Sequence, residues 1–323
     1  MYNPEVKHQG QLLKCSQNPS LYTSCYLEEV IRALYLISIN KKWFISAPLQ
    51  RVGQIFCFQL HFGSNWFYYS YLMDTENYFN NSKALITPAR EKGEPPIGPD
   101  ALMVAIPSEL AFLEDLVRAE RATLATSNPF KLFLAKRNND LPLALAGPLL
   151  GAPQGVMVME KLIALGAKRI WVLGWCGSLQ PSLLIGDLII PTTALSEEGT
   201  SAHYPVKKKI KETNPLLNAI LADALVKAHL SFRTGPVWTT DAIYRETVEK
   251  VTDYGKKGFL AVEMEMSALI TVALFRSVQL AGLLIVSDEL FSLEWRPGFG
   301  AEILKKRSRE AGRVLLDVCM NGK

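Results

Sequence analysis

The sequence predicts an α/β fold, a single domain with a central mixed, mostly parallel sheet flanked by helices, over residues 84–323. Short apolar runs that suit buried strands alternate with longer amphipathic segments that suit helices. The hydrophobic content of 49% is ample for a core, and the charged content of 20% is ordinary. No internal repeat or low-complexity tract interrupts the alternation. Strands separated by helices imply a sheet that is covered on both faces.

Residues 1–83 differ from the rest of the chain, and we assign no chemistry to them. They hold three of the five cysteines and dense aromatic runs such as residues 66–71, which lack a clean strand or helix period. Residues 28–39 could form one helix. We expect either an accessory N-terminal element or a start-site artefact in which the native protein begins at Met73, and we favour the artefact.

The elements of the predicted domain follow in order. Residues 84–101 are rich in Pro and Gly and predict a lead-in loop. A strand over 101–106 precedes a helix over 108–120, for which Ser108 is the expected N-cap. Further strands are predicted over 141–146, 169–173, 187–195, 235–239 and 282–286. Further helices are predicted over 154–165, 214–229, 262–275 and 301–319.

Composition excludes several classes of function. A net charge of +4 is too small to indicate nucleic acid or a membrane surface as a partner. Neither the five Cys nor the four His form a metal-ligand or Cys-x-x-Cys pattern. No apolar run reaches the roughly 18 residues that span a bilayer, and the N-terminus lacks a secretory layout. We expect a cytoplasmic protein without a metal or an organic cofactor.

Two carboxylates mark the junction between an apolar strand and a helix near the C-terminal end. Glu263 and Glu265 are two residues apart, so their side chains point the same way if the segment is extended. Carboxylates are rarely buried without a partner or a task. The pair could bind the two hydroxyls of a ribose, or it could cap the following helix, where negative charge is favourable.

Several other predicted strands end in small or polar residues, among them Gly147, Gly174, Asp241 and Asp288. Ligands of open α/β sheets bind outside the carboxyl ends of strands, so these positions favour a site there. Ordinary strand-to-helix turns are the alternative. Asp288 follows an apolar strand, where a partly desolvated carboxyl can act as a proton donor.

Three segments together resemble the nucleoside phosphorylase superfamily, which includes purine nucleoside and uridine phosphorylases and methylthioadenosine/S-adenosylhomocysteine nucleosidases. They are Val262-Glu-Met-Glu265, Ser287-Asp288 and the strand with a Gly/Pro turn over residues 143–154. The resemblance covers roughly residues 84–320 and implies a nucleoside phosphorylase-like fold. It also implies a homo-oligomer.

The resemblance implies roles for individual residues. Glu263, Met264 and Glu265 match the ribose-binding segment, and Asp288 matches the acid that protonates a purine. Further positions implied to contact substrate are Gly151, Gly174, Trp175, Asp241, Ile243, Tyr244 and His203. Of these, Ile243 and Tyr244 would stack on the base, and His203 would line this site or a neighbour's.

The nucleophile is the open question. Residues 102–113 resemble the nucleosidase segment in which a Glu, here Glu109, activates water; the alternative for Glu109 is a first-turn helix residue. Phosphorylases bring Gly and Arg to phosphate at the same place, and neither occurs between 102 and 113. Val172 stands where another phosphate-binding Arg is expected, and Trp175 where a Thr or Ser is expected.

These observations predict an enzyme that cleaves the N-glycosidic bond of a purine-type nucleoside, with a preference for hydrolysis. Asp288 and Glu109 are the expected catalytic residues. A phosphate-dependent purine or uridine phosphorylase is one alternative, in which phosphate is a co-substrate. A non-catalytic nucleoside-binding protein is the other.

Overall fold

The computed structural model describes residues 50–52, 55–62, 65–72, 84–124, 130–137, 141–206 and 211–321. The chain divides into two compact units, Met1–Ser82 and Lys83–Lys323. In the first unit, three strands form an antiparallel sheet: β1 (Gln50–Val52), β2 (Ile55–Phe62) and β3 (Asn65–Leu72). The aromatic run over 66–71, for which no element was predicted, therefore lies in β3. The predictions for residues 28–39 and Met73 lie outside the described residues.

The second unit is built on a mixed sheet of ten strands in the order β13-β12-β9-β10-β11-β8-β4-β7-β6-β5. In chain order, the first four strands of this sheet are β4 (Asp100–Val104), β5 (Glu120–Arg121), β6 (Lys131–Ala135) and β7 (Leu143–Gly147). Those that follow are β8 (Arg169–Ser178), β9 (Leu188–Glu197), β10 (Phe232–Thr240), β11 (Ala261–Glu263), β12 (Gln279–Glu289) and β13 (Arg296–Pro297).

Part of this sheet closes on itself. Five strands form a ring in the order β8, β12, β9, β10, β11 and back to β8. The pairs β8–β12, β9–β10 and β10–β11 are parallel, and the pairs β9–β12 and β8–β11 are antiparallel. From β8 the sheet continues in parallel through β4 and β7 and then in antiparallel fashion through β6 and β5. Since β4, β7, β8 and β12 run parallel, their carboxyl ends meet at one edge, where side chains of a site can gather.

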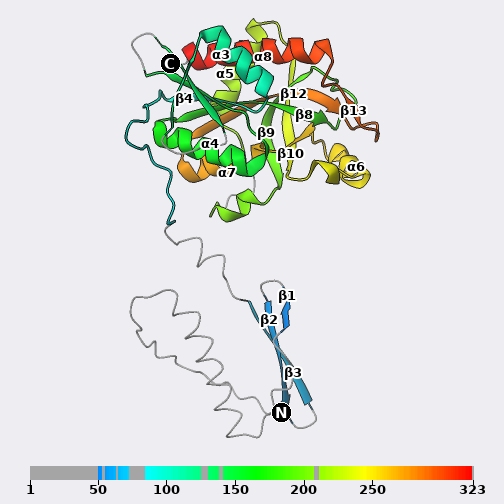
Figure 1. Cartoon of the computed structure of the whole chain (residues 1–323). Helices are drawn as coiled ribbons and strands as arrows, with labels where there is room; N and C mark the ends of the chain where they lie inside the picture. The colour runs from blue at the N-terminus through cyan, green and yellow to red at the C-terminus, as the bar shows by residue number, and fades with distance from the viewer. Residues whose placement is uncertain are drawn as a thin grey trace. The chain divides into compact units, whose positions relative to one another are not determined.

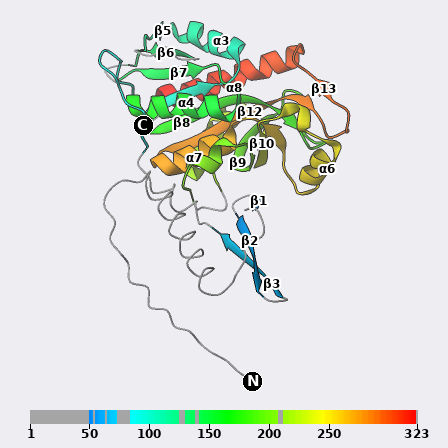
Figure 2. The ribbon, with the colours of Figure 1, turned by 60° about the horizontal axis from the view of Figure 1, so that its bottom comes forward.

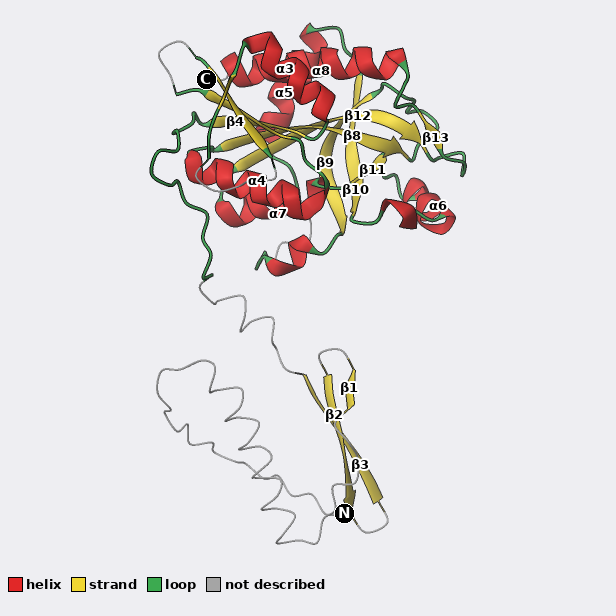
Figure 3. Cartoon of the chain, viewed as in Figure 1, coloured by secondary structure: helices red, strands yellow, loops and turns green. Residues whose placement is uncertain are grey.

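Helices cover both faces of the sheet, as Figures 1 and 3 show. On one face lie α4 (Gly151–Leu165) and α7 (Met266–Arg276), which Figure 2 shows side by side. On the other face lie α3 (Pro107–Val117), α5 (Pro215–Lys227) and α8 (Glu302–Asn321). The helix α6 (Val248–Lys256) packs through Val251 against Trp238 and Val262. Within the described part of the chain, no helix is long and apolar enough to cross a membrane.

The observed elements agree with the predicted alternation and differ from it in detail. The prediction that Ser108 caps α3 is wrong: the helix begins at Pro107 after Ile106, and no side chain caps it. Helix α4 begins at Gly151, three residues before the predicted start. Strands β5 and β6 and helix α6 were not predicted; α6 spans nine residues, of which only Val251 is buried.

A fully buried carboxylate anchors the start of β4. Asp100 accepts hydrogen bonds from Nε and Nη2 of Arg169 at 2.7 and 2.6 Å and from Nε1 of Trp171 at 3.0 Å. Nη1 of Arg137 lies 3.5 Å from the same carboxylate, and its Nη2 donates to the carbonyl of Cys319 at 2.7 Å. This cluster connects β4 and β8 to the C-terminal end of α8, which is distant from both strands in the sequence.

Candidate active site

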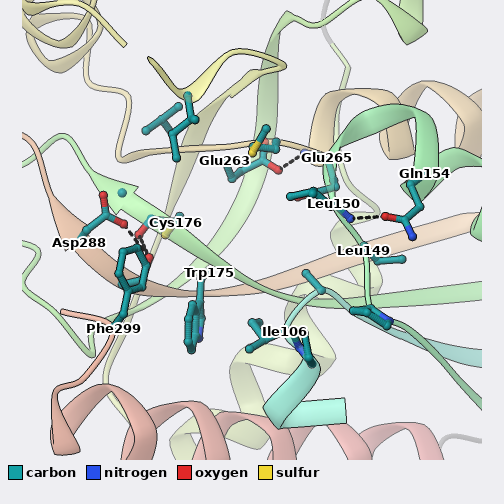
Figure 4. A pocket seen from close by; sticks show the side chains of 18 of the residues that line it. Ile106, Leu149, Leu150, Gln154, Trp175, Cys176, Glu263, Glu265, Asp288 and Phe299 are labelled. Carbon is teal, nitrogen blue, oxygen red and sulfur yellow. Dashed lines mark hydrogen bonds between the residues drawn. The ribbon is translucent and has the colours of Figure 1, made fainter. Parts of the chain in front are cut away.

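A cavity of about 490 Å³ opens where the carboxyl ends of β4, β7, β8 and β12 meet the junction of β11 with α7 (Figure 4). Its volume falls in the range of small-ligand pockets. Four carboxylates border it: Glu246, Glu263, Glu265 and Asp288. Among the described residues, no Lys, Arg or His lines the cavity. Its apolar wall includes Ile106, Leu149, Leu150, Trp175, Ile243, Val262, Met264 and Phe299.

Glu263 ends β11 and caps α7 from within the protein. Its Oε2 accepts hydrogen bonds from the backbone N–H groups of Glu265 and Met266, both at 2.7 Å, and its Oε1 accepts one from the hydroxyl of Thr239. Burial, and then the neighbouring Glu265 carboxylate, raise the pKa of Glu263. One oxygen of Glu263 therefore holds the backbone at the start of α7 and the other holds Thr239, which agrees with the helix-cap alternative for this residue.

Glu265 lies beyond the end of the strand, at the N-cap of α7, with φ −133° and ψ −36°. The expectation that an extended backbone aligns it with Glu263 is therefore wrong. Its Oε1 accepts a hydrogen bond of 2.6 Å from the amide of Gly151, the first residue of α4. Gly151 has φ +80°, a conformation that favours glycine. The N-terminus of α4 also attracts negative charge, so this contact fixes the carboxylate at the edge of the cavity beside Leu150 and Gln154 (Figure 4).

Asp288 lies at the other end of the cavity, near Phe299 and Cys176 (Figure 4). Oδ1 of Asp288 accepts a hydrogen bond from the hydroxyl of Ser287 at 2.7 Å, and Oδ2 accepts one from the indole N–H of Trp295 at 3.0 Å. Trp295 belongs to the segment that follows β12, and Phe299 of that segment stacks on Trp175 with ring centroids 6.0 Å apart. An aromatic wall therefore stands beside the Asp288 carboxylate and suits a flat heterocycle.

Gly177 allows β8 to pass close to Asp288. A Cβ atom at position 177 would lie 2.4 Å from Cδ1 of Leu290 and 3.1 Å from Oδ2 of Asp288. We expect Gly177→Ala to displace Asp288 and to lower the rate of a reaction in this cavity by about tenfold or more, because small misplacements of reacting groups are costly. Gly300→Ala is the matched control, since a Cβ there meets no atom within 4 Å. Equal kcat values for both variants and the wild type would contradict this prediction.

Several residues that the sequence predicted for the site lie elsewhere. Tyr244 is 97% exposed and does not line the cavity, whereas its neighbour Ile243 does. The Asp241 carboxylate instead accepts a hydrogen bond from the amide of Gly199 at 2.9 Å. His203 is exposed at the end of the short helix η1 (Thr200–His203). Gly174 is buried within β8, where a Cβ would lie 3.1 Å from Leu284.

Glu109 also lies outside the cavity lining. It is the third residue of α3, it is 3% exposed, and Arg309 and Lys305 of α8 are its charged neighbours. The hydroxyl of Ser108 donates to its Oε1 at 3.3 Å, and its Oε2 is buried without a hydrogen-bond partner. Burial raises the pKa of Glu109 above its ordinary value. The structure therefore does not bring this carboxylate to the other four.

Two features at the cavity were not predicted from the sequence. Glu246 follows the short helix η2 (Ile243–Arg245), is half-buried and lines the cavity. Burial, and then the charge of Asp288, raise the pKa of Glu246 to about 7. The second feature is the aromatic pair Trp295 and Phe299. In the sequence, only their positions connect these residues with a site. Glu246 follows the segment that resembles the base-binding segment of the family, and Trp295 and Phe299 follow Asp288.

Cys176 borders the cavity beside Asp288 and is buried. Burial, together with the nearby charges of Asp288 and Glu263, raises the pKa of its thiol well above the ordinary value. A thiol that stays protonated is a poor nucleophile. This agrees with a structural role for Cys176.

Comparisons with known proteins identify the family of this chain. The family model described as the phosphorylase superfamily matches residues 99–316. DeoD-type purine nucleoside phosphorylases of Bacillus cytotoxicus and Bacillus thuringiensis are each 32% identical over 154 residues, which are 47% of this chain and 66% of each relative. The match thus spans slightly less than two thirds of the relatives' length.

Solved structures of a uridine phosphorylase and a purine nucleoside phosphorylase share the fold. Uridine phosphorylase from Vibrio fischeri gives a TM-score of 0.61 at 22% identity, covering 69% of this chain and 92% of that chain. Purine nucleoside phosphorylase from Toxoplasma gondii, in complex with immucillin-H, gives 0.63 at 21% identity, covering 74% and 98%. Since the family model spans well over half of the chain and the fold agrees, this protein belongs to the nucleoside phosphorylase superfamily.

Proposed function

We propose that the protein cleaves the N-glycosidic bond of a purine-type nucleoside and that water is the nucleophile. The observation that carries this proposal is the set of ionisable side chains that line the cavity: four are carboxyl groups, and no described Lys, Arg or His is among them. The transition state of glycosidic bond cleavage carries positive charge on the sugar. Fixed carboxylates stabilise that charge, whereas they repel a phosphate dianion, which needs cationic donors.

The cavity offers a place for each part of a nucleoside. Glu265, fixed by the Gly151 amide, would accept hydrogen bonds from the ribose hydroxyls at one end. Asp288 would contact the departing base at the other end, beside the stacked rings of Trp175 and Phe299. Glu263 would hold the backbone at Met264 in position. The proposed reaction uses no metal or organic cofactor.

Base release from a panel of purine and pyrimidine nucleosides, with and without phosphate, tests the nucleophile. We expect release from a purine nucleoside at a rate that changes by less than about twofold when phosphate is added, because the cavity lacks charge-assisted donors for a dianion. The sugar product distinguishes the two reactions directly, as free ribose or as ribose 1-phosphate. Release that depends on phosphate would overturn hydrolysis.

Phosphorolysis is the second candidate, because the DeoD-type relatives that match this chain are named purine nucleoside phosphorylases. It would require cationic side chains from outside the described cavity lining. A uridine-cleaving enzyme is less consistent with Asp288 at the base end. The products formed from each nucleoside distinguish these reactions.

Asp288→Asn separates an enzyme from a nucleoside-binding protein without catalytic activity. We expect the variant to bind a purine nucleoside with little change while its turnover falls by about 10²-fold or more, the usual contribution of proton transfer to a leaving group. Calorimetric titration gives the affinity, and base release gives the turnover. If wild type binds nucleosides and releases no base from any of them, the non-catalytic alternative is correct.

A further inference from the structure

We infer that Trp295 is a positioning residue that places the proton for the leaving base on Oδ1 of Asp288, an assignment that rests on the proposed function and deepens it. Asp288 lines the cavity and Trp295 does not, so the indole acts on a substrate only through this carboxyl. The sequence predicted Asp288 as the acid. It gave no role to Trp295 and did not indicate which oxygen of the carboxyl holds the proton.

The chain after β12 folds back and brings Trp295 against Asp288. A turn in which Leu293 has φ +61° reverses the chain, and β13 then pairs antiparallel with the end of β12. Beyond β13, the amide of Gly298 donates a hydrogen bond of 2.9 Å to the carbonyl of Ser287. These backbone contacts hold Trp295, the residue directly before β13, beside the carboxyl.

Aromatic side chains connect Trp295 with the wall of the cavity. Its ring centroid lies 6.2 Å from that of Phe299 at an interplanar angle of 57°, and Phe299 stacks on Trp175. The indole N–H of Trp175 donates to the hydroxyl of Ser308 in α8 at 2.9 Å. Trp295 is nevertheless 60% exposed, so its direct contact with the site is the hydrogen bond to Asp288.

The two oxygens of Asp288 have partners of different chemistry. Oδ2 accepts a hydrogen bond of 3.0 Å from the indole of Trp295, and an indole N–H can only donate. Oδ1 lies 2.7 Å from the hydroxyl of Ser287, and a hydroxyl can either donate or accept. In a neutral carboxyl the carbonyl oxygen is a better acceptor than the O–H oxygen. The indole therefore favours Oδ2 as the carbonyl oxygen and Oδ1 as the oxygen that carries the proton.

The Ser287 hydroxyl has a second acceptor, which allows it to release Oδ1. Its Oγ lies 3.3 Å from the carbonyl oxygen of Cys176. When Asp288 is protonated, the hydroxyl can donate to this carbonyl and leave the O–H of Oδ1 free for a ring nitrogen of the base. When Asp288 is ionised, the hydroxyl can donate to Oδ1 again. The hydroxyl thus adapts to the proton, while the indole stays on Oδ2.

The step that Trp295 serves balances without another reactant. The proton on Oδ1 of Asp288 moves to a ring nitrogen of the purine while the bond between C1′ and the base breaks, and the bonding electron pair stays with the base. The oxygen of water then binds C1′, and the proton that this water loses returns to the Asp288 carboxylate. The products are the free base and ribose.

Trp295→Phe, measured with two leaving groups, tests the inference, because it removes the indole N–H and keeps an aromatic ring. With a purine nucleoside we expect kcat to fall by about tenfold, the weaker end of what one hydrogen bond to a charged group contributes, and KM to stay nearly constant. With p-nitrophenyl β-D-ribofuranoside, whose leaving group departs as a stable anion without a proton, we expect a loss of less than about threefold.

A double-mutant cycle with Asp288→Asn gives a second measurement. If Trp295 acts through Asp288, adding Trp295→Phe to Asp288→Asn should change the rate by less than about twofold. Ser292→Ala is the matched control, since it removes a hydrogen bond of 3.2 Å to the carbonyl of Glu294 in the same turn, and it should behave as wild type. Equal losses from Trp295→Phe with both leaving groups, or the same loss in the Asp288→Asn background, would overturn the inference. An unchanged kcat for the purine nucleoside would also overturn it.

A measurement without turnover separates this inference from the proposed function. Proton–nitrogen NMR of protein labelled with nitrogen-15 at the tryptophan indoles shows the Trp295 signal, which is identified by its absence from Trp295→Phe. We expect its N–H proton to resonate downfield in wild type and to move upfield in Asp288→Ala, which offers no acceptor. An unmoved signal would overturn the inference even in an active enzyme. If the signal moves and wild type cleaves no nucleoside, the proposed function fails, and the proton assignment fails with it.

Discussion

Glu265→Gln is expected to lower kcat/KM for a purine ribonucleoside by between about 10²- and 10⁴-fold. The carboxylate is fixed at the edge of the cavity by the amide of Gly151 at 2.6 Å. We propose that it accepts hydrogen bonds from two ribose hydroxyls, and hydrogen bonds to a charged group contribute about 1.5–3 kcal/mol each. The loss of both charge-assisted contacts, at 1.36 kcal/mol for each factor of ten, gives the expected range.

A substrate without the 2′ hydroxyl tests the cause of this effect. If Glu265 holds that hydroxyl, the substitution should harm cleavage of a 2′-deoxynucleoside less than cleavage of the ribonucleoside. Glu302→Gln, in the exposed first turn of α8, is the control and should leave both rates unchanged. Equal losses with both sugars would mean that Glu265 acts through the fold of α4 and α7 and does not contact the ribose.

Asp100→Asn is expected to lower the free energy of unfolding by about 3–5 kcal/mol, the usual cost of removing one partner from a buried ion pair. The fully buried Asp100 carboxylate accepts hydrogen bonds from Arg169 and Trp171, and Arg137 lies 3.5 Å away. The neutral side chain removes the negative charge that both guanidinium groups face. Urea titration monitored by circular dichroism measures the change.

Glu120→Gln is the comparison for Asp100→Asn. It breaks the pair between Lys136 and Glu120, which are 2.6 Å apart and 84% and 70% exposed. Solvent screening makes such pairs weak, so we expect no measurable change in the unfolding midpoint. Similar midpoints for both variants would show that the Asp100 cluster does not stabilise the fold.

Much of the fold could be predicted because its buried strands and amphipathic helices have strong periods. Strands such as β12 (Gln279–Glu289) were recognisable as apolar runs, and helices such as α4 as amphipathic segments. The elements that were not predicted are small local ones. Helix α6 buries only one residue, and β6 pairs at one side with the two-residue strand β5. Elements this short give only a few positions from which a period can be recognised.

The site was predictable where residues stand next to each other in the sequence and not where the fold brings them together. Glu263 and Glu265 were found as a pair, but their different tasks depend on Thr239 and Gly151, which are distant in sequence. Glu246 has no distinguishing sequence context, since its character comes from burial beside Asp288. Conversely, Glu109 matched a motif, yet it is buried in α3 outside the cavity lining.

The closed ring of strands has a consequence for the order of folding. Strands β9 and β10 pair over a separation of 44 residues, from Leu188 to Phe232, whereas β12 must return across 110 residues, from Arg169 to Gln279, to meet β8. Contacts between segments so far apart form late, because the entropy of closing the intervening chain is lost first. The cavity then exists only once β12 is seated. A nucleoside that binds there recognises only the completed fold, and it should raise the unfolding temperature in proportion to the logarithm of its concentration.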